Sequence, residues 1–218
     1  MKMKIQTEYY CQSLERLPAT GQHLTVHQQE DMVVVYQAYN HRIADFAVQN
    51  QYLGGDAFSY NRMSWIKPNF LWMMYRCGWA AKENQERVLA LWLHKSDFED
   101  ILRQAAFSSY KEEYYASHDA WRAALEEKPV RLQWDPEHDP YGNKIERRAI
   151  QLGLKGNVLE QFGRHNIKLI EDVTGFAKEQ YAFLQDNPSE KLLVPVENVY
   201  RTADEALNRS VGIVSLKN

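Results

Sequence analysis

Apolar residues recur along this chain with two different periods, and each period predicts its own kind of element. The run DMVVVYQAY, Asp31 to Tyr39, is short and rich in β-branched and aromatic residues, which favours a buried strand. Alternation along that strand places Val33, Val35, Gln37 and Tyr39 on one face. The sequence therefore predicts an amide, Gln37, within an otherwise apolar strand face.

The next segment changes to helical spacing. Asn40 can cap a helix, because its side-chain oxygen can accept a hydrogen bond from the first turn. The apolar positions that recur at this spacing are Ile43, Ala44, Ala47 and Val48. The Gly54-Gly55 pair then ends a unit of one strand and one helix.

Further runs extend the same mixture of strands and helices. They predict a strand at Arg87 to Leu93, a helix opened by the capping-box pair Ser96 and Glu99, a helix near Asp119 to Glu127, a long hairpin of Pro129 to Trp134 and Glu146 to Leu152, and helices capped by Asn157 and Thr174. No strict alternation of strand and helix is present. We therefore expect an α+β fold with a mixed, mostly antiparallel sheet, continuous or split, flanked by helices.

Length and composition favour one domain over 1–218, because no linker, low-complexity tract or repeat divides the 218 residues. The net charge of -3 argues against a generally basic protein that coats nucleic acid. The sequence shows neither a signal peptide nor an apolar run long enough to span a bilayer, which predicts a cytoplasmic protein without a membrane partner. Cys11 and Cys77 are interpreted as reduced thiols. The oligomeric state is left open.

The segment Arg62 to Lys82, RMSWIKPNFLWMMYRCGWAAK, combines three tryptophans, two arginines and two lysines around one predicted helix. Pro68 and Gly78 bracket that helix at the positions these residues usually take. One stripe of the helix holds Phe70, Met73, Met74 and Cys77, and the opposite stripe holds Trp72, Tyr75, Arg76 and Trp79. The first stripe is predicted to be core, whereas the second mixes a cation with large aromatic rings.

The cations of this segment suggest an anion site. Arg76 can stack on Trp72 and offer its planar donors to a carboxylate or phosphate. Arg62 and Lys67 precede the helix, whose free N–H groups and dipole also attract an anion. A phosphate-bearing ligand with an aromatic group would satisfy both features. Structural packing of the tryptophans and ion pairing of the cations is the alternative.

Other polar groups have two interpretations each. Gln37 either contacts a ligand or satisfies its amide within the fold. Arg148 shares a predicted strand face with Ile150 and Leu152, so its guanidinium pairs with a carboxylate or points into a pocket, whereas Arg147 is expected to face solvent.

The stretch from Asp135 to Asp139 gathers three carboxylates and an imidazole, enough for acid–base chemistry or a hard cation. The residues concerned are Asp135, Glu137, His138 and Asp139. A solvated turn between two strands is the alternative interpretation. The histidines lack zinc-ligand spacing, and the chain has no P-loop, GxGxxG or GxSxG motif, so no metal site is predicted.

Four stretches of the chain strongly resemble the bacterial and fungal family called domain of unknown function 4291. They are VVVYQAYN, RMSWIKPNFLWMMYRCGWAAKENQERVLAL, VRLQWDPEHD and RAIQLGL. The resemblance covers about Asp31 to Thr174 and leaves residues 188–218 as a less readable extension. The family pattern usually has threonine where Ser64 stands and serine where Cys77 stands, which argues against Cys77 as a required nucleophile.

Three functions follow from these patterns. The first is an enzyme that binds a nucleotide-like, phosphate-bearing ligand, because the order of elements is similar to that of ADP-ribosyltransferase-type folds, which bind NAD. That analogy implies Tyr36 and Gln37 near the nicotinamide, Arg62, Lys67 and Arg76 near the pyrophosphate, and Glu137 orienting the ribose or nucleophile. Gln37 stands where such transferases usually have His or Arg.

The second function is a non-catalytic module that stacks RNA bases, or another phosphorylated partner, on Trp65, Trp72 or Trp79 beside the cations. The third is a protein-interaction domain that uses the same aromatic surface. A closed cleft would favour the enzyme, an open stacking platform the RNA-binding module, and a flat apolar patch the interaction domain.

Overall fold

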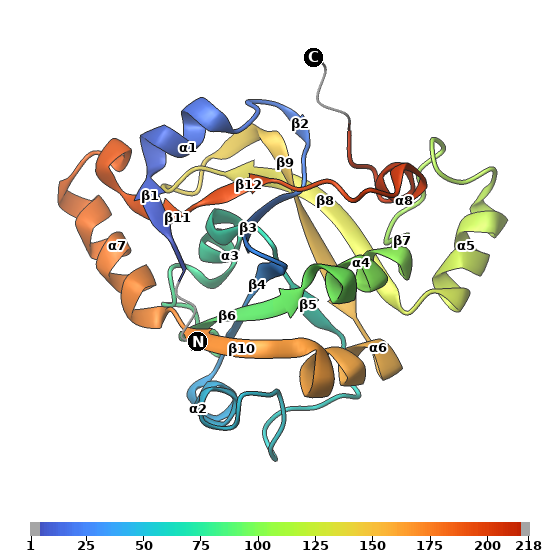
Figure 1. The fold of residues 1–218 in the computed structure, drawn as a ribbon, viewed down its shortest axis with the longest axis horizontal. Helices are drawn as coiled ribbons and strands as arrows, with labels where there is room; N and C mark the ends of the chain where they lie inside the picture. The colour runs from blue at the N-terminus through green and yellow to red at the C-terminus, as the bar shows by residue number, and fades with distance from the viewer. Residues whose placement is uncertain (1–4, 215–218) are drawn as a thin grey trace.

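The computed structural model describes residues 5–214 and is built on two five-stranded sheets (Figure 1). The first sheet has the order β10-β6-β4-β3-β12, and all of its neighbours are antiparallel. In that order its strands are Ile167–Asp172, Arg87–His94, Met32–Tyr39, Thr25–Gln29 and Glu197–Val199. The C-terminal part of the chain thus supplies an edge strand of the first sheet.

The second sheet has the order β2-β9-β8-β7, with β5 also paired to β9. Its strands are Gly21–Gln22, Lys144–Leu154, Val130–His138, Ala105–Phe107 and Ser64–Ile66. The β2 and β7 pairings are parallel, whereas those of β5 and β8 with β9 are antiparallel. An isolated bridge between Tyr36 and Lys67 connects the two sheets, and β1 (Thr7–Tyr9) pairs with β11 (Leu193–Pro195) apart from them.

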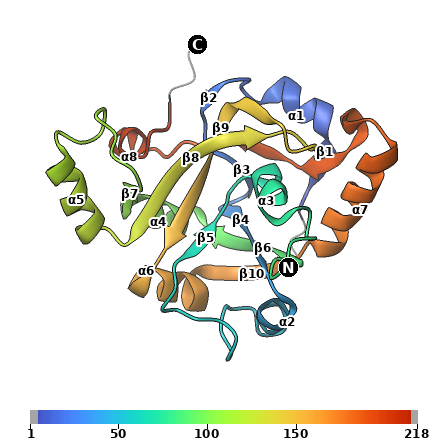
Figure 2. The same cartoon turned by 180° about the vertical axis from the view of Figure 1, so that it is seen from behind.

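Eight α-helices surround these sheets within the described range. They are α1 (Tyr10–Arg16), α2 (His41–Asn50), α3 (Phe70–Cys77), α4 (Lys95–Arg103), α5 (His118–Glu127), α6 (Gly156–Gln161), α7 (Thr174–Asp186) and α8 (Glu205–Ser210), with a π-helical turn at Phe162–Asn166 and a 3-10 turn at Ser189–Lys191. Both views place α3 near the middle of the molecule and α5 and α7 at opposite ends (Figures 1 and 2).

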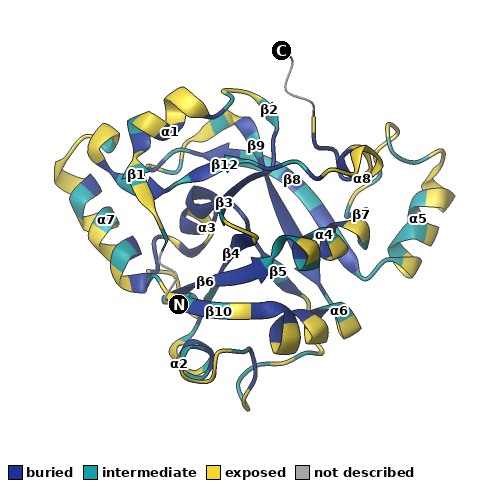
Figure 3. Cartoon of the chain, in the orientation of Figure 1, coloured by how far each residue is buried: buried dark blue, intermediate teal, exposed yellow. Residues whose placement is uncertain are grey.

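Strand β4 is buried on both faces, which explains its nearly continuous apolar sequence (Figure 3). Val33 and Val35 pack into the core between the two sheets. Val34 and Tyr36 pack on the opposite side, in a second core that includes residues of α3 and α7. Successive side chains of β4 therefore enter different layers, so Tyr36 and Gln37 point in opposite directions.

The structure confirms the predicted α+β class and several of the predicted element boundaries. Asn40 caps α2, and its Oδ1 accepts a hydrogen bond from the Ile43 backbone N–H at 3.1 Å. The predicted core stripe of α3 is buried, and Gly78 ends that helix with a left-handed φ of 57°. The cap of α3 is Asn69, whose Oδ1 accepts from the Trp72 backbone N–H at 2.7 Å.

Several local predictions are wrong. The hairpin strands are longer than predicted, so Asp135, Glu137 and His138 lie within β8 and the turn contains only residues 139–143. Helices α4 and α6 begin at Lys95 and Gly156, one residue before the expected caps Ser96 and Asn157. Thr174 is the first residue of α7 and not its cap.

The C-terminal residues pack with the rest of the chain through β11, β12 and α8, and residues 215–218 lie outside the described range.

Candidate functional site

A cavity of about 280 Å³ lies where β4, β5 and the start of α2 approach one another. Its polar and aromatic lining comes from Gln37, Tyr39, Ser59, Arg62, Ser64, Trp65, Lys67 and Gln85. Met73 of α3 and several apolar side chains complete the wall. We call this space the cationic cavity, because two basic side chains line it and no acidic side chain does.

The bridge between the sheets positions the cationic cavity. The backbone N–H of Tyr36 donates to the Lys67 carbonyl at 2.7 Å, and the Lys67 N–H donates back to the Tyr36 carbonyl at 3.0 Å. These bonds hold the end of β5 against β4, next to Gln37. Gln37 and Lys67, which are thirty positions apart along the chain, are therefore brought together by the backbone hydrogen bonds of this bridge.

Lys67 is the most unusual group in the cationic cavity. Its side chain is buried, with 6 % of the residue exposed, and Nζ donates a hydrogen bond to the Trp65 carbonyl at 3.2 Å. Burial, and after it the charge of Arg76, lowers the pKa of Lys67 to about 8, while Cys77 and Asp135 act in the opposite direction. Within residues 5–214 no carboxylate forms an ion pair with this ammonium group.

Gln37 contributes an unpaired acceptor to the same cavity. Its residue is 7 % exposed, and Nε2 donates to the Ser64 Oγ. Oε1 is buried without a partner among the described residues, a state that a native protein rarely leaves uncompensated. The Tyr39 hydroxyl lies 3.4 Å from the same Ser64 oxygen. A ligand hydroxyl, amine or water could donate to the free oxygen of Gln37.

Arg62 and Trp65 form the more accessible part of the lining. Arg62 is exposed and forms no ion pair within the described residues, so its planar donors are available to a ligand. Trp65 is half-buried, and its ring packs on the backbone of Gly153 in β9. Arg76 is also exposed; it does not line the cavity, but it is near enough to influence Lys67 electrostatically.

The structure thus brings together four of the predicted site residues and separates the others. Gln37, Arg62, Trp65 and Lys67 line one cavity. Tyr36 points into the opposite core, where its ring packs edge-on against Phe70 at 5.4 Å between centroids. The backbone of Tyr36 contributes to the site, whereas its side chain does not.

Trp72 and Arg148 also lie elsewhere. The Trp72 ring is buried and stacks on Tyr75 and His138, where the sequence suggested Arg76. Arg148 donates to the Trp134 carbonyl at 2.9 Å and lines a different cavity, of about 320 Å³, together with Asp135. Neither side chain lines the cationic cavity.

Glu137 occupies a buried ion pair. Arg147 donates from Nε and from a terminal nitrogen to the two Glu137 oxygens, each at 2.6 Å, and both side chains are almost fully buried. The expectation that Arg147 faces solvent is therefore wrong. The face that Arg147 shares with Ala149 and Gln151 is itself buried, so alternation along β9 does not turn this side chain toward solvent. Glu137 does not line the cationic cavity.

The start of α3 is occupied by the protein's own carboxyl group. Glu197 accepts a hydrogen bond from the Phe70 backbone N–H at 2.6 Å and another from Asn69 Nδ2 at 2.8 Å. Burial raises the pKa of Glu197 to about 8, which favours the protonated acid near neutral pH. The predicted anion site at the helix start is therefore filled from within, and Arg62 and Lys67 line a neighbouring cavity instead.

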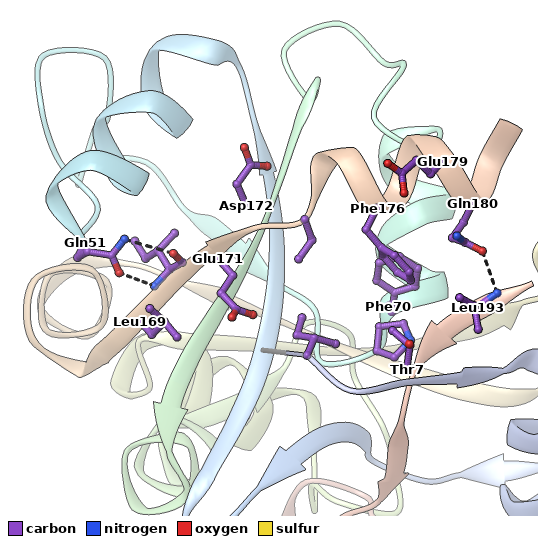
Figure 4. A pocket seen from close by; sticks show the side chains of 14 residues that line it. Thr7, Gln51, Phe70, Leu169, Glu171, Asp172, Phe176, Glu179, Gln180 and Leu193 are labelled. Carbon is purple, nitrogen blue, oxygen red and sulfur yellow. Dashed lines mark hydrogen bonds between the residues drawn. The ribbon is translucent and has the colours of Figure 1, made fainter. Parts of the chain in front are cut away.

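A larger cavity, of about 790 Å³, lies away from these residues (Figure 4). Its walls are mainly apolar, with Phe70, Phe176 and Leu169 among them. Gln51 bonds the backbone of Ile170 through both amide atoms, and Gln180 accepts from the Leu193 N–H. Size alone favours this cavity, but its amide groups are already bonded within the fold. We therefore place the candidate site in the smaller cationic cavity.

Sequence reasoning missed Tyr39, Ser64 and Gln85 as parts of the site. Ser64 had a usable signal, because a small hydroxyl residue lies between Arg62 and Lys67 in the most distinctive segment of the chain. Tyr39 shares the β4 face with Gln37 and could have been grouped with it by alternation. Gln85 carries no signal that links it to these residues.

Comparison with protein families gives one match. The model of a domain of unknown function, DUF4291, matches residues 23–200. The chain belongs to the DUF4291 family. This match includes every residue of the cationic cavity, so the site lies within the family domain. A search of curated proteins found no match to the chain.

The described residues of this DUF4291 protein were also compared with the requirements for a membrane-spanning helix and for a metal site. Over residues 5–214, no helix combines the length and apolar character needed to cross a membrane. In the same range, no three His, Cys, Asp or Glu side chains are grouped as a metal site would require.

Proposed function

We propose that this DUF4291 protein is an enzyme that binds a small phosphate-bearing ligand in the cationic cavity. The observation that carries the proposal is the pair of basic side chains, Arg62 and Lys67, that line one cavity without a carboxylate partner among the described residues. Basic groups that no protein acid neutralises favour an anion from outside, and guanidinium groups bind phosphate with two parallel donors.

The remaining lining fits the rest of such a ligand. Gln37 offers a buried acceptor, and Ser64 and Tyr39 offer hydroxyl groups. The half-buried ring of Trp65 provides a flat apolar wall. Small-molecule sites typically have a small number of polar groups that converge on a largely preformed cavity.

The volume of about 280 Å³ favours a compact ligand over an extended dinucleotide. A nucleotide-like ligand such as NAD stays within the proposal as one member of the class to be tested. An ADP-ribosyltransferase that uses Glu137 in catalysis is less favoured, because both oxygens of Glu137 already accept hydrogen bonds from Arg147. An RNA-stacking surface is less favoured, because Trp72 and Trp79 are only 5 % and 7 % exposed.

Thermal stabilisation tests the proposal. The purified chain would be heated with inorganic phosphate, 3-phosphoglycerate, AMP, NAD and a short RNA, because a ligand that binds the folded state raises the unfolding temperature. We expect a compact phosphorylated compound to raise it most. Arg62→Gln should weaken that binding about tenfold, since one charge-assisted contact is lost.

Arg122→Gln is the matched control, because Arg122 is, like Arg62, an exposed arginine, and it lies on α5 outside the cavity. Its variant should bind as the original chain does. The proposal fails if no phosphorylated compound stabilises the chain. Equal weakening by both variants would also contradict it, because the effect would then be one of net charge.

A further inference from the structure

The Lys67 side chain ends in an amine that the fold does not otherwise use. A charged ammonium group has three donors, yet Nζ has one hydrogen-bond acceptor among the described residues, the Trp65 carbonyl. Lys67 also lines the cationic cavity, whose volume is large enough for a ligand beside it. A neutral amine at this position would have a lone pair that no described group uses.

We infer that Lys67 is a nucleophile that forms an imine with the carbonyl group of a small anionic aldehyde or ketone. The inference rests on the proposed function, because the anionic group of the same molecule is to be held by Arg62. It deepens that function by naming the substrate as a phosphorylated carbonyl compound. The catalytic residue is Lys67, because its nitrogen forms the covalent bond.

The surroundings of Lys67 favour the neutral amine. Burial and the positive charge of Arg76 hold the pKa of Lys67 at about 8, so about one amine in ten is neutral at pH 7. Asp135 and Cys77 act in the other direction. Burial raises the pKa of the Cys77 thiol, which keeps that group uncharged near neutral pH.

The bond changes in this step balance without another reactant. The Nζ lone pair attacks the carbonyl carbon, the C=O π electrons move to oxygen, and a proton passes from nitrogen to oxygen to give a carbinolamine. Loss of that hydroxyl with the second nitrogen proton releases water and leaves the C=N bond. The hydroxyl groups of Tyr39 and Ser64 line the same cavity and can donate to the departing oxygen.

Tyr39 suits this role because it stays protonated. Burial raises the pKa of Tyr39 above its usual range, so its hydroxyl keeps a proton to donate. Gln37 complements it, since the free Oε1 can accept from the carbinolamine hydroxyl or from a substrate hydroxyl. The cavity thus contains a nucleophile, an anion-binding cation, a donor and an acceptor.

Reductive trapping tests the inference on the intact chain. Pyridoxal 5′-phosphate, which carries both an aldehyde and a phosphate, is mixed with the protein, the imine is reduced with borohydride, and the modified lysines are identified by peptide mass mapping. We expect Lys67 to be modified at least tenfold faster than the exposed Lys168 and Lys178, with its rate levelling off above about pH 8.

Lys67→Arg keeps the positive charge but removes the amine, so it should lose the fast modification while Lys168 and Lys178 react as before. Peptide mapping of the chain without any substitution does not depend on that variant, so the test remains valid if Lys67→Arg fails to fold. The inference is overturned if Lys67 reacts no faster than the two exposed lysines, or if no reduced adduct forms there.

The same experiment separates the inference from the proposed function. Pyridoxal, which lacks the phosphate, should modify Lys67 about tenfold more slowly, and inorganic phosphate should protect it. Equal rates for the two aldehydes, without protection, would support the nucleophile but contradict the anion site. Stabilisation by phosphate together with an unreactive Lys67 would support the anion site and reject the imine.

Discussion

Two polar regions contact α3, and they differ in whether their charges are satisfied by the protein. The carboxylate cluster, which consists of Asn69, Glu137, Arg147 and Glu197, is buried and densely bonded around a void of only about 20 Å³. The cationic cavity has fourteenfold more space, and its basic groups have no carboxylate partner within residues 5–214. We propose that the first region stabilises the fold and that the second binds a ligand.

This difference shows that burial of a charged residue does not by itself indicate a site. Glu137 and Lys67 are both buried, with 1 % and 6 % of the residue exposed. Glu137 is neutralised by a bidentate arginine, whereas Lys67 keeps a single backbone acceptor. Substitutions should therefore have opposite signs in the two regions: destabilising in the carboxylate cluster and stabilising in the cationic cavity.

The largest effect is expected for Arg147→Met. The change removes three hydrogen bonds, two to Glu137 and one to the Pro18 carbonyl, and it leaves the Glu137 charge buried without its ion-pair partner. Breaking a buried ion pair from one side lowers the free energy of unfolding by about 4 kcal/mol. Urea denaturation at neutral pH measures this loss.

The neighbouring arginine provides the control. Arg148→Met removes a hydrogen bond to the Trp134 carbonyl at a partly exposed position, and it should lower the free energy of unfolding by less than about 1 kcal/mol. Equal losses for the two variants would mean that the Glu137–Arg147 pair is not the source of stability. The carboxylate cluster could then not be contrasted with the cationic cavity as the region that stabilises the fold.

Glu197 should make stability depend on pH. Its pKa in the folded state is about 8, against 4.5 when exposed, so the folded chain retains a proton between these values that the unfolded chain has lost. The resulting stabilisation is complete below pH 4.5 and is lost as the pH rises through about 8. Between pH 4.5 and pH 7, we expect this one group to account for a decrease of about 3 kcal/mol in the free energy of unfolding.

Glu197→Gln isolates that contribution. The variant cannot ionise, but its amide nitrogen also cannot accept from Asn69, so it is expected to lose about 1 kcal/mol at every pH. The informative quantity is therefore the slope of unfolding free energy against pH, which should be shallower in the variant. Identical slopes would show that Glu197 ionises normally, and the cluster would then contain two negative charges.

Sequence reasoning identified the components of both regions but not their pairing. The caps and core stripes could be predicted because they depend on neighbours a few residues away, as for Asn40 in α2 and Met73 and Met74 in α3. Arg62 and Lys67 could be grouped for the same reason, and both line the cationic cavity. The pairing of Arg147 with Glu137 depends on burial of the β9 face on which Arg147 lies, which no local pattern indicates.

Long-range contacts account for the other differences. Glu197 reaches the start of α3 from a strand more than a hundred residues away, and this contact fills the anion site that the helix would otherwise offer. The opposite orientations of Tyr36 and Gln37 were predictable from strand alternation, yet the analogy with a transferase placed them together. Physical alternation was the better guide at this position.

Lys67→Met should give the smallest effect of the three and the opposite sign. Methionine matches the length of the lysine stem and removes a buried ammonium that has no carboxylate partner within the described residues, so the variant should gain about 1 kcal/mol at pH 7. Because the folded-state pKa of Lys67 is lowered to about 8, its penalty is complete below that pH and disappears as the pH rises toward 10.5. Urea denaturation at pH 7 and at pH 10 should therefore show the gain shrinking, together with lost phosphate binding at pH 7. Destabilisation at pH 7 comparable to that of Arg147→Met would mean that Lys67 is a structural group like Glu137, and the contrast between the two regions would not hold.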